Sequence, residues 1–421
     1  MKQPLSLVVI SQVYPPDPAS VGQFMADVAE EMARRVQRVT VYTSARGYEN
    51  PRERYARKET RNGVHVRRIP FAWFGKGSLA RRMVGGVAFT LQTTVRAAFQ
   101  RRVDVVLVST TPPIVPAAAL LLRLFRRAQI VYWVMDLNPD QLVALGRARP
   151  GALSVRAFEQ LNRWILSAAR RLIVLDRSML ARLNAKMPVT AKSSVVSLWP
   201  HAHELAPAPT SRASNEFRRR YVRDGRLAVL YSGNHSPANP IATLLRAAES
   251  LRADDRVVFL FVGGGDEKAQ VDAVQGDTIV SLPYQPIERV HESLAAADIH
   301  VVTMGDAVVG IVHPSKIYAA LGAGRPVLYI GPGDSVLAEM VERERIGWSI
   351  RHGDVAGVVA ALEQAHGHPE LLAEFGERSR RLAQSSRGHD IQCGRICDLV
   401  IEAAVGGRTG ADTVEPATLD A

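Results

Sequence analysis

The sequence predicts an α/β protein with two Rossmann-like domains that face each other across a cleft. Short, almost continuously apolar strand candidates alternate with amphipathic helical patterns, which is typical of a parallel sheet covered on both faces. A chain of 421 residues is too long for one ordinary core. Residues 204–226, rich in Pro, Ala, Ser and charge, interrupt the alternation before it starts again, and we interpret them as the linker region.

The first domain is predicted to cover residues 1–203. Its strand candidates are residues 5–11, 39–44, 64–70, 103–110, 129–136, 171–176 and 194–199. Helical patterns lie between them at residues 21–35, 79–101 and 154–170. Because parallel strands end at one edge of a sheet, the turns that follow them are expected to line a ligand-binding edge.

The second domain is predicted to cover residues 227–382. Its strand candidates are residues 227–233, 257–265, 278–283, 299–304, 327–331 and 348–354, and its helices lie near residues 240–252, 287–297 and 355–366. We expect a helix at residues 383–404 to pack back toward the first domain. Residues 405–421 lack periodicity and are expected to form a disordered tail.

The formal charge of +12 is divided unevenly along the chain. Residues 1–200 carry 31 Lys and Arg against 12 Asp and Glu, whereas residues 201–421 carry 22 against 29. This division indicates an anionic partner for the first domain only. No nucleic-acid-binding module is recognisable, so we expect no nucleic acid among the partners.

Two segments combine apolar residues with arginine clusters, residues 71–102 and 120–127. This composition suits a helix that lies on an anionic membrane surface. It equally suits a helix that packs on the core and exposes its arginines to water. The first interpretation predicts a peripheral protein at the inner face of the membrane.

The chain has only two cysteines, Cys393 and Cys397, which is too few for a disulfide framework. They are either two buried thiols on one helix face or half of a metal site, and no further ligands are evident. We therefore expect a cytoplasmic protein without a bound metal. No apolar run approaches the ~20 residues needed to span a bilayer.

Residues 310–332 carry the strongest functional signal. A loop containing Gly310, His313 and Ser315 leads through Lys316 into an apolar helical pattern, and a short apolar strand follows. Pro314 suits the first turn of that helix. Free backbone N–H groups, a helix start, a hydroxyl and an ammonium group at one place favour binding of an anion, and we interpret the segment as a diphosphate site.

Other turns follow the strand candidates at the same predicted edges. In the second domain these are residues 231–236, the triple glycine 263–265 and residues 283–286. In the first domain, Gly22 opens a helix after the first strand and could allow close backbone approach to a ligand. Asp136 ends the fifth strand, where it either orients a sugar hydroxyl or caps the next helix.

Five segments together resemble one known family. They are YPPDPASVGQF (14–24), DLNPDQLVALG (136–146), YSGNHSPANP (231–240), FVGGGDE (261–267) and HPSKIYAALGAGRPV (313–327). These segments, in this order, resemble family 4 retaining glycosyltransferases of the GT-B architecture. They are most similar to the colanic-acid and O-antigen type, which builds bacterial surface polysaccharides.

The resemblance implies a nucleotide-sugar donor, usually a UDP-sugar, that is held mainly by the second domain. It also implies transfer with retention to a lipid-linked or growing glycan acceptor, with no metal or other cofactor required. Asp136 and Lys316 would carry the chemistry. The residues expected to bind the donor are Gly22, Gly233, Asn234, His235, Gly264, Gln285, Ile287, Gly310, His313, Ser315 and Lys316.

The chain departs from the family pattern at four positions. Ile311 and Ala319 stand where many members have two glutamates, and Asn234 and Asn239 stand where many have an arginine and a lysine. His235, His313 and Lys316 would then be the cations that meet the diphosphate. Two alternatives stay open, namely a nucleotide-sugar epimerase of the same architecture and a catalytically silent nucleotide-sugar-binding subunit.

Overall fold

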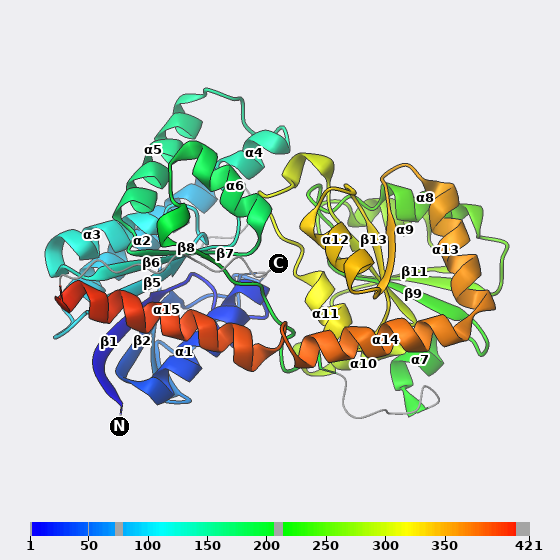
Figure 1. The fold of residues 1–421 in the computed structure, drawn as a ribbon, viewed down its shortest axis with the longest axis horizontal. Helices are drawn as coiled ribbons and strands as arrows, with labels where there is room; N and C mark the ends of the chain where they lie inside the picture. Colours follow the sequence, from blue (N-terminus) through cyan, green and yellow to red (C-terminus); the bar gives the residue numbers. More distant parts are fainter. Residues whose placement is uncertain (1, 49, 72–78, 206–213, 410–421) are drawn as a thin grey trace. The chain divides into compact units, whose positions relative to one another are not determined.

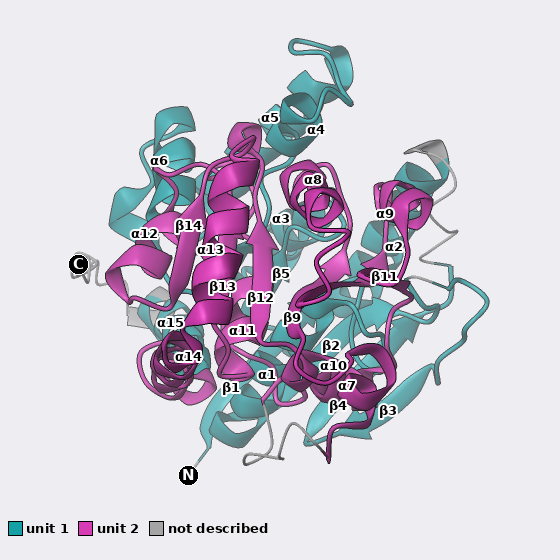
Figure 2. Cartoon of the chain, turned by 90° about the vertical axis from the view of Figure 1, so that its right-hand side faces the viewer, with its two compact units in different colours: residues 1–197, 392–421 teal, residues 198–391 magenta. Residues whose placement is uncertain are grey.

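The computed structural model describes residues 2–48, 50–71, 79–205 and 214–409. The chain forms two compact units, residues 1–197 with 392–421 (unit 1) and residues 198–391 (unit 2; Figure 2). Each unit contains a sheet whose strands alternate with helices along the chain (Figure 1). The predicted α/β class with two parallel-sheet domains is confirmed.

The sheet of unit 1 has eight strands in the order β3-β4-β2-β1-β5-β6-β7-β8. In chain order they are β1 (Gln3–Ile10), β2 (Val36–Ser44), β3 (Lys58–Arg61), β4 (Val64–Ile69), β5 (Val105–Ser109), β6 (Gln129–Val134), β7 (Arg171–Val174) and β8 (Ser193–Val195). All neighbouring pairs are parallel except β3 and β4. The sequence analysis missed β3 because its four residues are all polar and carry no apolar signal.

The helices of unit 1 are α1 (Ser20–Arg35), α2 (Leu79–Ala98), α3 (Pro116–Arg126), α4 (Asp140–Ala144), α5 (Leu153–Ala168) and α6 (Arg177–Lys186). Helix α1 connects β1 to β2, which lies on one side of β1 in the sheet. Helices α2 and α3 lead to β5 and β6, which lie on the other side. Right-handed crossovers therefore place α1 and the α2–α3 pair on opposite faces of the sheet. Helix α3 contacts both α2 and α5.

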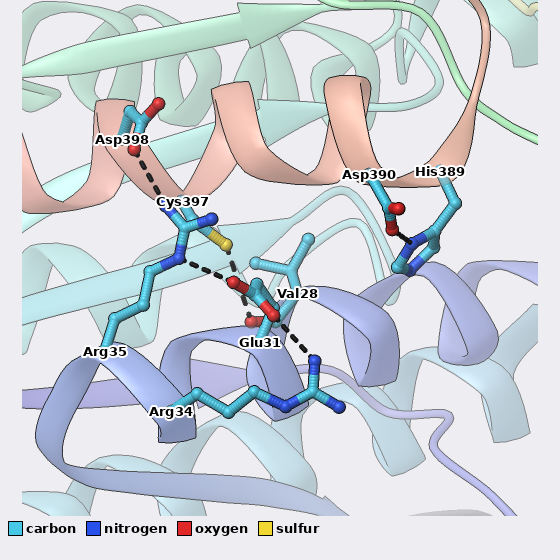
Figure 3. Close-up of polar contacts among 8 residues, drawn as sticks. All are labelled: Val28, Glu31, Arg34, Arg35, His389, Asp390, Cys397 and Asp398. Carbon is cyan, nitrogen blue, oxygen red and sulfur yellow. Dashed lines mark hydrogen bonds and ion pairs between the residues drawn. The ribbon is translucent and has the colours of Figure 1, made fainter. Parts of the chain in front are cut away.

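The long C-terminal helix α15 (His389–Thr409) spans the boundary between the units, and its part from Gln392 onward belongs to unit 1. Its buried face consists of Cys393, Ile396, Cys397, Val400, Ala403 and Ala404. Arg35 of α1 bonds Glu31 at 2.7 Å and Asp398 of α15 at 2.8 Å, beside the thiol of Cys397 (Figure 3). Both cysteines are free and buried, as one of the two sequence interpretations expected.

Unit 2 has a fully parallel six-stranded sheet in the order β11-β10-β9-β12-β13-β14. The strands are β9 (Leu227–Asn234), β10 (Val257–Gly264), β11 (Ile279–Leu282), β12 (Ile299–Thr303), β13 (Val327–Ile330) and β14 (Gly347–Ile350). Alternate residues of β9 enter two different core clusters, with Val229 in one and Leu230 in the other. Helices therefore cover both faces, which explains the continuous apolar runs.

The helices of unit 2 are α7 (Glu216–Tyr221), α8 (Ala242–Ser250), α9 (Lys268–Val274), α10 (Val290–Ala296), α11 (Lys316–Gly322), α12 (Val336–Arg343), α13 (Val355–Gly367) and α14 (Pro369–Gln384). Helix α7 lies inside the region that we interpreted as a linker. It is capped by Asn215, whose side chain accepts the N–H of Arg218 at 2.8 Å, and it buries Phe217 in the core of unit 2. The chain instead passes between the units after Ser197.

Two further expectations differ from the structure. Helix α15 extends to Thr409, beyond the residue 405 at which we expected a disordered tail, and residues 410–421 lie outside the described residues. Helix α11 begins at Lys316 with Ser315 at its N-cap, so Pro314 lies before the cap rather than in the first turn. In both places the sequence predicted the helix but misplaced its end.

Candidate functional site

In unit 2, β9 pairs with β10 on one side and with β12 on the other, so the strand order reverses direction between β9 and β12. Open α/β sheets bind ligands outside the carboxyl ends of their strands at such a reversal. Strand β9 ends at Asn234, and β12 ends at Thr303 before a loop that leads to α11. The turns that the sequence analysis singled out in unit 2 therefore lie at this reversal.

Lys316, the first residue of α11, reaches back to the end of β9. Its Nζ donates a hydrogen bond to the carbonyl oxygen of Asn234 at 3.2 Å and lies 5.1 Å from the centre of the Tyr231 ring. Burial lowers the pKa of Lys316 to about 8, because the site removes much of the ammonium group's hydration. The side chain is therefore still cationic at neutral pH, and none of the described carboxylates pairs with it.

Gly233 lies directly beneath the Lys316 side chain. Its φ of +117° is in the region that favours glycine, and an added Cβ would lie 3.0 Å from Cε of Lys316. A larger residue would displace the lysine. The contact joins two of the predicted donor-binding positions, Gly233 and Lys316, which lie 83 positions apart along the chain.

His235 does not serve as a cation, contrary to our expectation. Its side chain is fully buried and clusters with the rings of Tyr231 and Phe261, at centroid distances of 4.9 and 6.4 Å. Burial, with lesser contributions from the Lys268 and Lys316 charges, lowers the pKa of His235 to about 4. Its backbone N–H already donates a hydrogen bond to the carbonyl of Gly264 at 2.7 Å, so it is not available to a ligand. A neutral core histidine results.

The triple glycine allows close packing between the ends of β9 and β10. A Cβ at Gly263 would lie 2.0 Å from the carbonyl oxygen of Gly233, and one at Gly265 would lie 2.4 Å from that of His235. Both glycines have positive φ. Gly264 packs against the ring of Tyr284, whose hydroxyl donates to the Gly264 carbonyl at 3.3 Å. The glycines let the carboxyl ends of β9 and β10, and the residues that follow them, lie in close contact.

The loop before α11 presents a mixture of engaged and available groups. His313 is buried, and its Nε2 lies 3.0 Å from the hydroxyl of Tyr318, so it is turned toward the helix. Gly310 turns the loop with φ +67°. The hydroxyl of Ser315, at the N-cap of α11, makes no hydrogen bond within the described residues. Ser315 and Lys316 are therefore the polar groups available at this helix start.

Gln285 and Ile287, the positions expected to hold a base, follow β11 at the same edge of the sheet. Gln285 is half-buried, and its Nε2 donates to the carbonyl of Pro283 at 3.0 Å. Ile287 begins a short 3₁₀ turn and is half-buried. The neighbouring Tyr284 is 49% exposed and presents an aromatic surface beside Gly264.

In unit 1, Asp136 follows β6 at the carboxyl edge of the sheet. Its backbone N–H donates to the hydroxyl of Thr110 at 3.2 Å, whereas its carboxylate has no hydrogen-bond partner among the described residues. Burial raises the pKa of Asp136 to about 6. Helix α4 has Pro139 at its N-cap, so the alternative role of Asp136 as the cap of that helix is excluded.

Gly22, in α1, is explained by packing within unit 1. An added Cβ would lie 2.9 Å from the backbone carbon of Val13 and 3.0 Å from the nitrogen of Tyr14. The glycine thus lets α1 approach the turn after β1 closely. Its approach to a bound donor stays a prediction.

Two family models match this chain. Residues 20–199 match the glycosyl transferase 4-like domain, and residues 226–368 match the glycosyl transferases group 1 domain. These ranges follow the two sheets. The chain belongs to the glycosyltransferases of GT-B architecture. The resemblance seen in the sequence is confirmed.

Curated relatives of this glycosyltransferase extend over most of its length. WbjE of Pseudomonas aeruginosa, named as a glycosyltransferase, is 27% identical over 283 residues, which cover 66% of this chain and 68% of WbjE. WcaI of Escherichia coli (strain K12), named as a colanic acid biosynthesis glycosyl transferase, is 24% identical over 404 residues, which cover 89% of this chain and 96% of WcaI.

Solved structures share the fold of this glycosyltransferase. Sucrose-phosphate synthase from Thermosynechococcus elongatus superposes with a TM-score of 0.77 at 15% identity, covering 96% of this chain and 100% of that one. HepE of Anabaena in complex with UDP-glucose superposes with a TM-score of 0.67 at 13% identity, covering 94% and 100%.

The two glutamate positions of the family are apolar and buried in this glycosyltransferase. Ile311 is 2% exposed, and Ala319 is 9% exposed within the core cluster formed with β9 and β10 residues. A carboxylate buried at either position would lose most of its hydration, which is costly unless a partner compensates its charge. The substitutions are therefore part of a consistent local packing.

Sequence reasoning missed Tyr231, whose ring lies under Lys316 and whose hydroxyl donates to the Asn234 carbonyl at 3.1 Å. The only available signal was an aromatic residue near a strand end. Among the residues that the structure describes, no group of three His, Cys, Asp or Glu side chains could hold a metal ion. No described helix is both long and apolar enough to cross a membrane.

Proposed function

We propose that this glycosyltransferase moves a sugar from a nucleoside diphosphate sugar, a UDP-sugar, to a lipid-linked or growing glycan acceptor with retention. Surface polysaccharide assembly is the setting that we propose. The names of WbjE and WcaI support the acceptor class, and the UDP-glucose complex of HepE supports the donor class. The families of the two domains support the reaction type.

The observation that carries the proposal is the position of Lys316 at the strand-order reversal of unit 2. Its ammonium group joins the start of α11 to the end of β9, beside Gly233 and the hydroxyl of Ser315. When the sugar leaves its nucleotide, negative charge develops on the diphosphate. A fixed cation in a partly dehydrated site stabilises this charge more strongly than water does. Lys316 is thus proposed to stabilise the leaving group.

Lys316 matters more to the proposal because the arginine and lysine of the family pattern are absent from this chain. Asn234 and Asn239 stand at those positions and carry no charge, and His235 is neutral. We propose that the N–H groups and hydroxyl of the loop around Ser315 hold the diphosphate together with Lys316, without a metal ion. The exposed ring of Tyr284 lies where a base could stack.

Asp136 is proposed to orient the acceptor hydroxyl in unit 1 and to accept its proton as the new glycosidic bond forms. Its carboxylate is half-buried at the carboxyl edge of the sheet, and its pKa of about 6 leaves it ionised at neutral pH. A general base with a pKa just below the working pH is well matched to this step.

A transfer assay tests the proposal. The protein is incubated with radiolabelled UDP-glucose, UDP-galactose or UDP-N-acetylglucosamine and with polyprenyl-diphosphate-sugar acceptors, and the glycolipid product and its anomeric configuration are measured. We expect acceptor-dependent UDP release and a product that keeps the donor's anomeric configuration. Inversion, or conversion of the donor sugar without acceptor, would contradict the proposal and indicate an epimerase in the second case.

One observation favours a second candidate function, a subunit that binds the nucleotide sugar without turning it over. The buried Ile311 and Ala319 remove both glutamates of the family pattern. Saturable donor binding by calorimetry, with no transfer to any acceptor of the panel, would favour this alternative.

A further inference from the structure

Helix α2 presents its larger apolar side chains to solvent. Its buried face is built from small and hydroxyl-bearing residues together with one phenylalanine, namely Gly85, Gly86, Phe89, Thr90, Thr93, Thr94 and Ala97. Its exposed apolar residues are Val84, Val87, Leu91 and Val95, with Met83 beside them, and the exposed Phe99 follows its last residue and donates its N–H to the carbonyl of Val95 at 3.3 Å. This pattern is the reverse of the one that a helix on the surface of a water-soluble protein shows.

The exposed apolar residues of α2 form one continuous stripe. At 100° per residue, the positions 84, 87, 91, 95 and 99 fall within about 120° of the helix circumference. The alternative interpretation of this segment, a core helix with a solvated arginine face, predicts arginines along this arc. Val84 is 60% exposed and Phe99 87% exposed, and of the described arginines of α2 only Arg81, at the edge of the arc, falls within it.

Helix α3 extends the apolar surface at the end of α2. Its exposed residues Leu124 and Phe125 are 72% and 65% accessible. The guanidinium group of Arg126 donates to the carbonyl oxygens of Gln100 and Arg101 at 2.7 and 3.1 Å, which holds the end of α3 beside the end of α2. We call the exposed apolar residues of α2 together with Phe99, Leu124 and Phe125 the α2–α3 surface.

Positive charge surrounds the α2–α3 surface. Between residues 60 and 135 the chain carries eleven arginines and one lysine, and Asp104 is its sole acidic residue. Arg82 and Arg96 are exposed on α2 itself, and Arg101, Arg123 and Arg127 are exposed near its end. An apolar stripe flanked by cations matches a bilayer whose acyl region is apolar and whose headgroups are anionic.

We propose that the α2–α3 surface docks this glycosyltransferase onto an anionic lipid bilayer. The apolar stripe would enter the boundary between headgroups and acyl chains, and the flanking arginines would meet lipid phosphates. The inference rests on the proposed function only in that a lipid-linked acceptor lies at such a bilayer. The inference names the side chains that would contact the bilayer. The basic charge of the first half of the chain does not identify them by itself.

Vesicle co-sedimentation of the full chain tests this surface. The vesicles are phosphatidylcholine alone or phosphatidylcholine with phosphatidylglycerol, and the variants are L91Q/V95Q and R82Q/R96Q. A matched control, I391Q/V405Q, removes two exposed apolar side chains from α15, where Ile391 is 49% and Val405 40% exposed. Thermal melts and gel filtration with light scattering check the fold and the mass of each variant.

We expect binding to the anionic vesicles only, since each basic residue near such a surface contributes ~1 kcal/mol, or about fivefold in affinity. L91Q/V95Q should weaken the affinity by about tenfold or more because two apolar side chains no longer enter the bilayer. R82Q/R96Q should weaken it by about 25-fold, following the same figure for each arginine. The I391Q/V405Q control should bind as the parent does.

Three results would overturn the inference. They are absence of binding to anionic vesicles, equal binding by all variants, and a dimer that becomes a monomer in L91Q/V95Q without any vesicle binding. The last would assign the surface to a second copy of the chain. The assay needs neither donor nor acceptor, so vesicle binding without sugar transfer would contradict the proposed function and leave this surface standing.

Discussion

Lys316 and His235 lie close together at the carboxyl edge of the unit 2 sheet, and burial lowers the pKa of both. The consequence differs because their ordinary pKa values differ. Lys316, with a pKa of about 8, keeps its charge at pH 7, whereas His235, with a pKa of about 4, loses it. Of these two residues, Lys316 alone offers a positive side-chain charge to a diphosphate, and this follows from burial that the sequence does not reveal.

Asp136 gives a residue-scale prediction with a defined pH window. Its pKa rises from the ordinary value of 3.8 to about 6 in the folded protein. The folded state therefore holds this proton more tightly than the unfolded state, and its stability falls as pH rises from about 4 to 6. Asp136→Asn should match the parent near pH 4 and exceed it by up to about 3 kcal/mol above pH 6, measured by urea unfolding.

The activity of the same variant should change in the opposite direction. If Asp136 accepts the acceptor's proton, kcat/KM of the parent should fall below pH 6, and Asp136→Asn should lose at least about 100-fold at pH 7.5. A gain in stability together with a loss of rate is not expected of a residue that only supports the fold. A variant with the parent's rate and pH profile would exclude the proposed role.

At the scale of elements, the glycines at the end of β10 make its close approach to the end of β9 possible. Gly263→Ala should destabilise the protein by about 3 kcal/mol or more, because its Cβ would lie 2.0 Å from the Gly233 carbonyl oxygen at a positive φ. Gly353 has φ +86° with nothing within 4 Å of an added Cβ, so Gly353→Ala should cost only about 1 kcal/mol.

Urea unfolding of the two variants measures this difference. Equal losses of stability would mean that backbone conformation alone decides the cost, and that the close contact between the ends of β9 and β10 contributes nothing. A larger loss for Gly263→Ala would support the packing role that we assign to the triple glycine.

The apolar strands could be predicted from the sequence because each is buried on both faces and reads as a continuous run. Polar strands could not be predicted in this way, because a strand such as β3, with four polar residues, has no apolar run. Helix α7 was mistaken for part of a linker, because a single buried residue, Phe217, gives its six residues little periodic signal. Helix ends were misplaced at Pro314 and near residue 405, where capping and packing decide the boundary rather than composition.

The candidate site was predictable in its location but not in its chemistry. The turns after parallel strands must lie at one edge, so the residues around 233, 264 and 310–316 were expected together. The contact of Lys316 with Asn234 depends on the way two distant loops pack, which no local pattern contains. His235 stands in a polar segment and is expected to be exposed, yet it is buried against two aromatic rings.

At the scale of the whole molecule, the chain crosses between the two units twice, after Ser197 and within α15. The return of α15 to unit 1 is held mainly by its buried apolar face, since exposed ion pairs such as Arg35 with Asp398 each contribute at most about 1 kcal/mol. The basic charge and the α2–α3 surface both lie in the first half of the chain. The diphosphate site proposed here lies in unit 2.

The central claim is that Lys316 stabilises the diphosphate that leaves the donor sugar. The most direct measurement compares kcat/KM for sugar transfer in the parent and in Lys316→Met, with the thermal unfolding temperature of each. The matched control is Lys268→Met, because Lys268 donates instead to the carbonyls of Phe261 and Leu282 within the unit 2 core.

The account predicts that Lys316→Met loses about 100-fold or more in kcat/KM, or about 3 kcal/mol of transition-state stabilisation. Its unfolding temperature should stay the same or rise, because a dehydrated ammonium group is removed. Lys268→Met should instead lower the unfolding temperature and keep most of the rate of the folded enzyme. Transfer by Lys316→Met at close to the parent's rate would contradict the account.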